Sequence, residues 1–187
     1  MNLLPSSRTL LLFLMVASLC PTIGHAQDQL ATFPDDWYGD WEGQVTTYAM
    51  GGRKLYDLKM ELHVSPTDSA HRIKWTIVYD TGEKRDERGY EMVAQDTAYT
   101  YFILDEKNSI FLDSYRSRNY LLSRFSVNQT LLMTSYYHAG DHIRCEIFTG
   151  RMDEKNVSGD TLDPSIGVTE VASYPMSSVQ RALLYRK

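Results

Sequence analysis

Cysteine is scarce in this sequence, which contains only Cys20 and Cys145 among its 187 residues. If the N-terminal segment that carries Cys20 is removed, a single thiol is left and no intramolecular disulfide can form. The remaining domain of about 160 residues is long enough to be held together by its hydrophobic core. Cys145 alternates with Ile143 and Ile147, so we expect a small buried core residue rather than a reactive thiol.

Long apolar runs are also absent. The most apolar stretch, Leu10–Leu19, has ten residues, whereas a membrane-spanning helix needs roughly 20. Arg8 precedes it and the small-x-small sequence Gly24–Ala26 follows, as in a cleavable export signal. We therefore expect residues 1–26 to be a signal peptide and the exported protein, periplasmic or secreted, to begin at Gln27. The alternative is lipid attachment at Cys20, although the residue before it is a bulky leucine where lipoprotein signals usually carry a small one.

Positive charge is in short supply as well. The full chain has 19 basic and 24 acidic residues, and residues 1–26 hold one arginine and no acid. Residues 27–187, which we expect to form one domain, therefore carry 18 basic and 24 acidic residues, a net charge of −6. An acidic balance argues against nucleic acid and anionic membrane surfaces as partners.

Motifs of catalytic sites and phosphate-binding loops are missing. The sequence contains no Gly-x-Ser-x-Gly, no phosphate loop and no Cys–His pair in a recognisable context. Asp105, Glu106 and Asp113 are close in sequence, but acids in hairpin loops usually serve turn geometry and solubility. The charged run 81–88 is likewise typical of a solvated loop. We expect no catalytic residue.

Histidines are few, and none is well placed for a metal or a haem. His138 and His142 flank a turn that contains Asp141, but a loose turn supplies no second shell of support, so we expect solvated side chains. A haem needs an axial ligand inside the protein, and His63 falls on the polar face of its segment. We therefore expect no metal and no cofactor.

Two-residue alternation is the pattern that the sequence does have. Residues 56–64 are apolar at every second position, at Tyr56, Leu58, Met60, Leu62 and Val64, with polar residues between them. Successive side chains of a β-strand point to opposite faces, so this segment has one buried face and one wet face.

Similar segments recur through the chain, separated by turn residues and without a helical apolar stripe. This predicts an all-β fold, a single antiparallel up-and-down β-barrel of about 8–10 strands, because closure removes the exposed edges of such a sheet. The polar segment 152–166 is predicted to be a long surface loop. Residues 177–187 suit a helix or a strand, and we favour a strand that helps to close the sheet.

The first predicted strand resembles a family signature. Gly39-x-Trp41 resembles the motif that begins the first strand of lipocalins and their calycin relatives, and Trp41-x-Gly43 is similar to nitrobindin-type haem-binding barrels. The resemblance implies a cup-shaped barrel that holds a small, largely apolar molecule. It also implies that Trp41 closes the barrel base beneath a basic side chain from a late strand. The candidates for that basic side chain are Arg144, Arg151 and Arg181.

Aromatic residues are plentiful at positions predicted to face inward, where they would suit the walls of a binding cavity. The alternative is that they simply pack a filled core. The candidate pocket residues are Tyr56, Met60, Trp75, Tyr79, Tyr101 and Tyr136, with Ile77 and Phe148 as further inward positions.

These observations favour an exported, non-enzymatic protein that binds a small apolar or amphipathic ligand. Two alternatives stay open: a packed barrel that serves as a structural or protein-interaction module of the cell envelope, and an enzyme that acts at the barrel mouth.

Overall fold

The computed structural model describes residues 30–159, 165, 167 and 169–187. The expected signal peptide, the expected cleavage after Ala26 and the alternative lipid site at Cys20 lie outside the described residues. Within the described part of the chain, no helix is long and apolar enough to cross a membrane.

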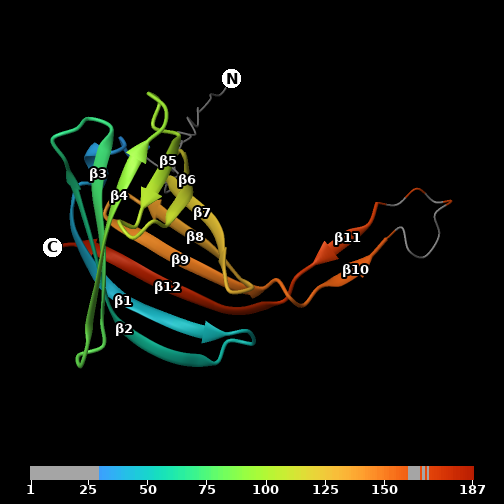
Figure 1. Cartoon of the computed structure of the whole chain (residues 1–187). Helices are drawn as coiled ribbons and strands as arrows, with labels where there is room; N and C mark the ends of the chain where they lie inside the picture. Colours follow the sequence, from blue (N-terminus) through green and yellow to red (C-terminus); the bar gives the residue numbers. More distant parts are fainter. Residues whose placement is uncertain (1–29, 160–164, 166, 168) are drawn as a thin grey trace, which may run out of the picture.

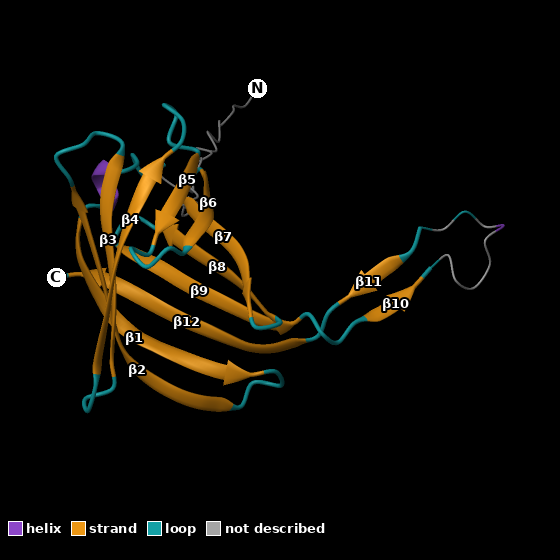
Figure 2. Cartoon of the chain, in the orientation of Figure 1, coloured by secondary structure: helices purple, strands orange, loops and turns teal. Residues whose placement is uncertain are grey.

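Ten strands form a closed antiparallel barrel (Figures 1 and 2). Each strand pairs with its neighbours in the chain, and the last strand, β12, closes the barrel against β1. This confirms the predicted fold class, and it confirms residues 177–187 as a strand. The strands are β1 (Gly39–Ala49), β2 (Lys54–Pro66), β3 (Arg72–Asp80), β4 (Arg85–Ala94), β5 (Tyr101–Asp105), β6 (Phe111–Ser117), β7 (Tyr120–Val127), β8 (Thr130–His138), β9 (His142–Arg151) and β12 (Met176–Arg186).

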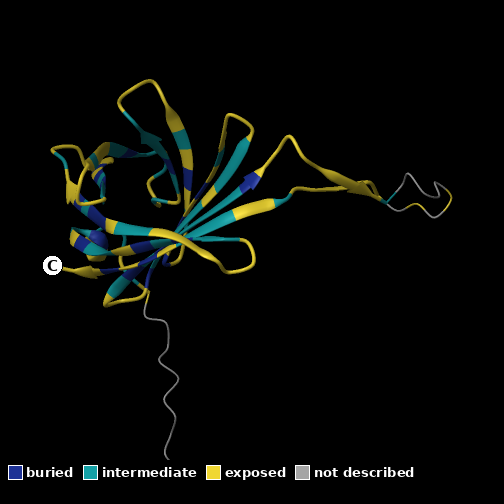
Figure 3. Ribbon diagram, turned by 90° about the horizontal axis from the view of Figure 1, so that it is seen from below, coloured by how far each residue is buried: buried dark blue, intermediate teal, exposed yellow. Residues whose placement is uncertain are grey.

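A two-stranded arm leaves the barrel between β9 and β12 (Figure 1). Its strands β10 (Asn156–Ser158) and β11 (Val171–Ser173) pair with each other and are exposed throughout (Figure 3). The prediction of a plain surface loop over 152–166 is therefore wrong for β10. The three-residue alternation of β10 is too short to stand out in the sequence.

The two ends of the barrel differ in what covers them. A short 3-10 helix, η1 (Asp35–Trp37), and the chain that leads into β1 lie at the end where β1 begins and β12 finishes. We call this end the base. The arm and the turns β1–β2, β3–β4, β5–β6 and β7–β8 lie at the opposite end, because the strands alternate in direction. We call this end the mouth.

Strand register determines which side chains point inward. Met60, Leu62 and Val64 of β2 pair with Tyr79, Ile77 and Trp75 of β3, so both sets share the inner face. Met60, Leu62, Val64 and Trp75 are at most 2% exposed. The alternation read from residues 56–64 therefore identified the inner face of β2.

Candidate ligand-binding site

The base is packed with aromatic rings. Trp41 and Trp37 are fully buried, and the Trp41 indole nitrogen donates a hydrogen bond to the Trp37 carbonyl oxygen at 3.0 Å. The Trp37 ring lies 6.1 Å from the Trp75 ring and 5.6 Å from the Phe33 ring. Helix η1 thus carries its tryptophan into the barrel as a plug.

A single arginine links the plug to the barrel wall. The Arg186 guanidinium lies 4.3 Å from the centre of the Trp41 ring and donates hydrogen bonds to the carbonyl oxygens of Tyr38 and Asp36, at 2.6 and 2.9 Å. Gly39 has φ +136°, and a Cβ there would lie 2.7 Å from Arg186 Nη1. The backbone conformation at the start of β1 therefore favours glycine, and any larger residue would also displace the guanidinium.

The basic partner of Trp41 is thus Arg186, and the three candidates inferred from the resemblance are wrong. The register pairs Trp41 with Arg186 directly, whereas Arg181 lies opposite Thr46 and faces outward. The other two candidates also have outer partners: the Arg144 guanidinium lies 5.0 Å from the Tyr137 ring, and Arg151 pairs with Asp153.

His138 belongs to the base and is not a solvated turn residue. It is 3% exposed, and its ring lies 5.4 Å from that of Trp37 and 5.5 Å from that of Trp41. Its Nε2 donates to the Asp36 carbonyl oxygen at 3.0 Å, and its Nδ1 accepts from the Gly140 amide at 3.2 Å. These bonds require the neutral ring with its proton on Nε2, and burial lowers the His138 pKa accordingly.

The alternation of β8 explains why His138 is buried, because Tyr136 points inward and His138 follows two residues later.

His142 lies apart from His138, and its Nδ1 is hydrogen-bonded to Asp141 Oδ1 at 2.7 Å. Among the residues that the structure describes, no three His, Cys, Asp or Glu side chains come together as a metal site would require.

Beyond the base, the barrel encloses a cavity of about 880 Å³ that opens at the mouth; we call it the large lobe. The rings of Trp75 and Tyr136 pack edge to face, with their centres 5.2 Å apart, and form the floor of this lobe. Ser114 and Ser123 share a buried 2.6 Å hydrogen bond in the wall. Further lining residues include Ile77, Leu104, Leu112, Leu121, Phe125, Leu132, Thr134 and Ile147.

A second cavity of about 380 Å³ adjoins the first; we call it the small lobe. Tyr79, Arg88, Leu132 and Ile147 line both lobes and mark their junction. The small lobe is more polar, and its further lining residues include Val45, Thr47, Tyr56, Leu58, Thr81, Lys84, Asp86 and Gln180.

The hydroxyl and thiol groups of the interior are uncharged. Burial raises the pKa of Tyr79 and of Tyr136 above the ordinary tyrosine value. Burial also raises the pKa of Cys145 to about 12. Cys145 is 1% exposed, as expected of a core residue without thiolate reactivity.

The predicted pocket residues divide into three groups. Trp75, Tyr79 and Tyr136 line the large lobe, and Tyr56 lines the small lobe near the rim. Met60 faces inward but is fully buried in the core. Tyr101 does not belong to the cavity.

Tyr101 lies on the outer wall, where its hydroxyl donates to Asp113 Oδ1 at 2.7 Å and its ring stacks on Tyr115 at 5.0 Å. Phe102 and Leu104 point inward instead. The sequence Tyr-Phe-Ile-Leu is apolar in both phases, so alternation could not assign a face. Phe148, next to the inward Ile147, was misassigned for the same reason.

Asp86 and Arg88 line the cavities near the mouth, with side chains 41% and 51% exposed, and the sequence pattern did not indicate it. Strand β4 begins at Arg85, within the run expected to be a solvated loop, and its register pairs Asp86 with Tyr79 and Arg88 with Ile77. Both residues consequently face into the barrel. Asp86 and Arg88 are in phase with the inward Tyr90 and Met92, but every residue from 85 to 88 is charged, so the sequence shows no contrast between the two faces of this strand.

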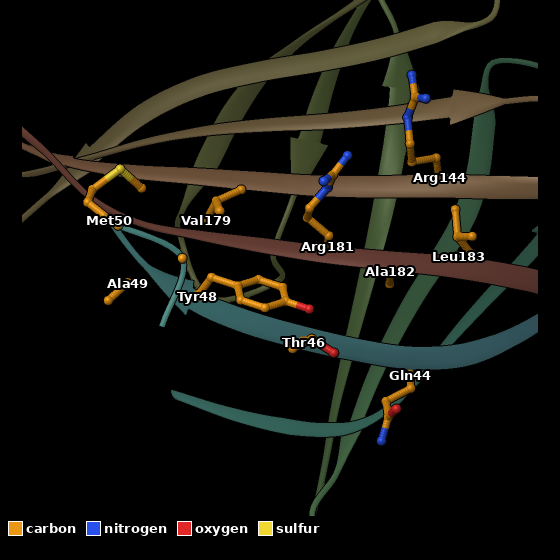
Figure 4. Close-up of a pocket in the computed structure, with 12 residues that line it drawn as sticks. Gln44, Thr46, Tyr48, Ala49, Met50, Arg144, Val179, Arg181, Ala182 and Leu183 are labelled. Atoms are coloured by element: carbon orange, nitrogen blue, oxygen red, sulfur yellow. The ribbon is translucent and has the colours of Figure 1, made fainter. Parts of the chain in front are cut away.

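A third hollow of about 750 Å³ lies on the outer wall over β1, β12 and β9 (Figure 4). Its side chains include Gln44, Thr46, Tyr48 and Arg181, which alternate with inward residues such as Val45 and Ala182. Arg181 Nε donates a hydrogen bond to Glu146 Oε1 at 3.0 Å. This hollow is a groove between outward side chains and does not connect with the interior through the paired strands β1 and β12.

No family model matches the sequence, and no curated protein matches it. Among solved structures, the fold is similar to a protein of unknown function from Nostoc punctiforme, of the DUF3598 family. The two chains share 12% sequence identity with a TM-score of 0.57, and the match covers 84% of this chain and 50% of the other. This chain thus spans about half the length of that protein. The likeness concerns the fold alone.

Proposed function

We propose that this chain is an exported, lipocalin-like protein that binds a small apolar or amphipathic molecule in its barrel and performs no catalysis. The observation that carries the proposal is the large lobe of about 880 Å³. Small-molecule sites usually have volumes of about 300–1,000 Å³, mostly apolar walls and a few polar groups. The tryptophan, tyrosines and paired serines of the large lobe fit that description.

The alternatives are less well supported. A packed structural module would fill its interior, whereas only the base of this barrel is filled. An enzyme at the mouth would need an acid and a base free to reach the substrate. Four charged residues line the lobes: Asp86 and Arg88 are bound to each other at 2.7 Å, and Lys84 and Glu106 lie in two different turns at the rim.

Uptake of an apolar fluorescent probe, N-phenyl-1-naphthylamine, tests the proposal. Thr134→Trp places a large ring in the wall of the large lobe, and Met133→Trp places the same ring outside, where Met133 is 44% exposed. We expect the wild type and Met133→Trp to bind the probe alike and Thr134→Trp to bind it at least about tenfold more weakly, because the ring fills the site. A wild-type protein that takes up no apolar probe would refute the proposal and favour the packed module.

Export has its own test. The small-x-small sequence before Gln27 predicts a mature protein that starts at that residue. Intact mass and N-terminal sequencing of the exported form would check this. A lipid-bearing N-terminus at Cys20 would instead place the barrel on a membrane surface.

A further inference from the structure

An ion pair stands at the junction of the two lobes. Asp86 Oδ2 accepts hydrogen bonds from Arg88 Nε at 3.0 Å and Nη2 at 2.7 Å. The Arg88 guanidinium also lies 5.3 Å from the centre of the Tyr79 ring, which lines both lobes. Two protein groups therefore hold Arg88, the Asp86 carboxylate and the Tyr79 ring, while the Arg88 side chain is 51% exposed and that of Asp86 is 41% exposed. A bound molecule that passes from one lobe to the other must lie against this pair.

The charges that line the interior cancel. Besides the pair, the charged lining residues are Lys84 and Glu106, which have opposite signs and lie in the β3–β4 and β5–β6 turns at the rim. Asp86 neutralises Arg88, so the junction offers no unmatched positive charge to an anionic group. A ligand carboxylate would have to compete with Asp86 for the guanidinium or lie beside a second carboxylate.

The small lobe nevertheless offers neutral hydrogen-bonding groups. Gln180 points inward from β12, and its amide makes no hydrogen bond to any residue that the structure describes. Asp86 Oδ1 accepts none from the described residues either, because both Arg88 bonds go to Oδ2. An amide provides both donors and an acceptor, and a carboxylate oxygen accepts from a hydroxyl.

We propose, building on the binding function proposed above, that the ligand is a neutral amphiphile. Its hydroxyl- or amide-bearing head lies in the small lobe against Gln180 and Asp86, and its apolar tail lies in the large lobe above Trp75 and Tyr136. Asp86 determines this specificity by neutralising Arg88. A tail in the large lobe shields part of this half-exposed pair from water, so an unpaired charge there becomes less favourable, which disfavours an anionic head.

The test uses three ligands with the same twelve-carbon chain length and different heads: monolauroylglycerol, laurate and dodecylamine. Each displaces N-phenyl-1-naphthylamine from the wild type, from Asp86→Asn and from Gln180→Leu. Glu87→Gln is the matched control, because Glu87 is the exposed outward neighbour of Asp86 on the same strand. Probe uptake and thermal melting of each variant report whether the fold and the large lobe are intact.

We expect wild-type protein to bind monolauroylglycerol more tightly than laurate or dodecylamine. Asp86→Asn leaves Arg88 charged and unneutralised, so laurate affinity should rise by about tenfold or more, the effect of a charge-assisted hydrogen bond. Gln180→Leu should weaken monolauroylglycerol by about three- to tenfold relative to any change in the affinity of the apolar probe. Glu87→Gln should change none of these affinities.

The outcomes separate the two proposals. Suppose that the wild type takes up the probe but binds laurate or dodecylamine at least as tightly as monolauroylglycerol. That result would overturn the neutral-head proposal and leave the binding function standing. An unchanged laurate affinity in a folded, probe-binding Asp86→Asn variant would overturn the role of Asp86. Failure of the wild type to take up the probe at all would overturn the binding function itself.

Discussion

The base and the mouth of this barrel are built by the same strands with the same alternation, yet one end is solid and the other is hollow. At the base the inward positions carry Trp41, Trp75 and His138, and the helix η1 adds Trp37. Around the large lobe, strands β6 to β8 turn small side chains inward, at Ser114, Ser123 and Thr134. The period of the pattern selects the inner face, whereas side-chain volume decides whether that face fills the barrel or leaves a cavity.

The largest effect should follow from opening the base. Trp41→Ala removes a fully buried ring together with its hydrogen bond to Trp37, so we expect the free energy of unfolding to fall by about 3–5 kcal/mol. Tyr56→Ala at the half-exposed rim should cost less than about 1 kcal/mol. Urea unfolding of the two variants measures the contrast, and equal losses would show that base and rim contribute alike to stability.

A smaller loss should follow from removing the arginine that holds the plug. Arg186→Gln loses the cation–π contact with Trp41 and leaves the Tyr38 and Asp36 carbonyl oxygens with weaker donors. We expect a cost of about 1–3 kcal/mol, since the guanidinium is reached by solvent and water can replace part of the bonding. Arg181→Gln, on the outer wall, should cost at most about 1 kcal/mol. Similar losses for both arginines would contradict the special role of Arg186.

The base should also be sensitive to acid. Burial keeps the His138 pKa below its ordinary value of 6.5, so the unfolded chain binds this proton more readily than the folded one. The stability that His138 contributes is therefore fully present above about pH 6.5 and is lost as the pH falls toward the lowered pKa. Urea unfolding at several pH values between 7.5 and 5 should show a steeper decline for the wild type than for His138→Gln. Parallel curves would indicate that the ring is not buried in its neutral form.

Much of the inner face was predictable from the sequence, because polar contrast at every second residue is a local property. It identified Tyr56, Met60, Trp75 and Tyr79 as inward. It failed at Tyr101, where adjacent residues are all apolar and either phase is consistent with a strand. It also failed at Asp86 and Arg88, whose charges suggested a loop.

Other features depend on contacts between distant strands. The partnership of Trp41 with Arg186 follows from the register of β1 against β12, which joins the two ends of the barrel sequence. The cavity depends on small residues of β6, β7 and β8 that face one another across the barrel. A local pattern contains neither the register nor the volume left between facing side chains, so these parts of the site required the structure.

The smallest effect is expected when a ring on the inner face of the barrel wall and a ring on its outer face are each replaced by leucine. Trp75→Leu replaces the ring at the floor of the large lobe by a smaller side chain and removes the edge-to-face contact with Tyr136. The affinity for the apolar probe should therefore change by about fivefold. Tyr101→Leu removes an aromatic ring from the outer wall, where the Tyr101 hydroxyl donates to Asp113 and the ring stacks on Tyr115, and should leave probe affinity unchanged. Fluorescence titration of both variants with N-phenyl-1-naphthylamine measures this difference. If Tyr101→Leu altered probe binding as much as Trp75→Leu did, the probe would be bound outside the barrel, and the hollow interior would not be the binding site.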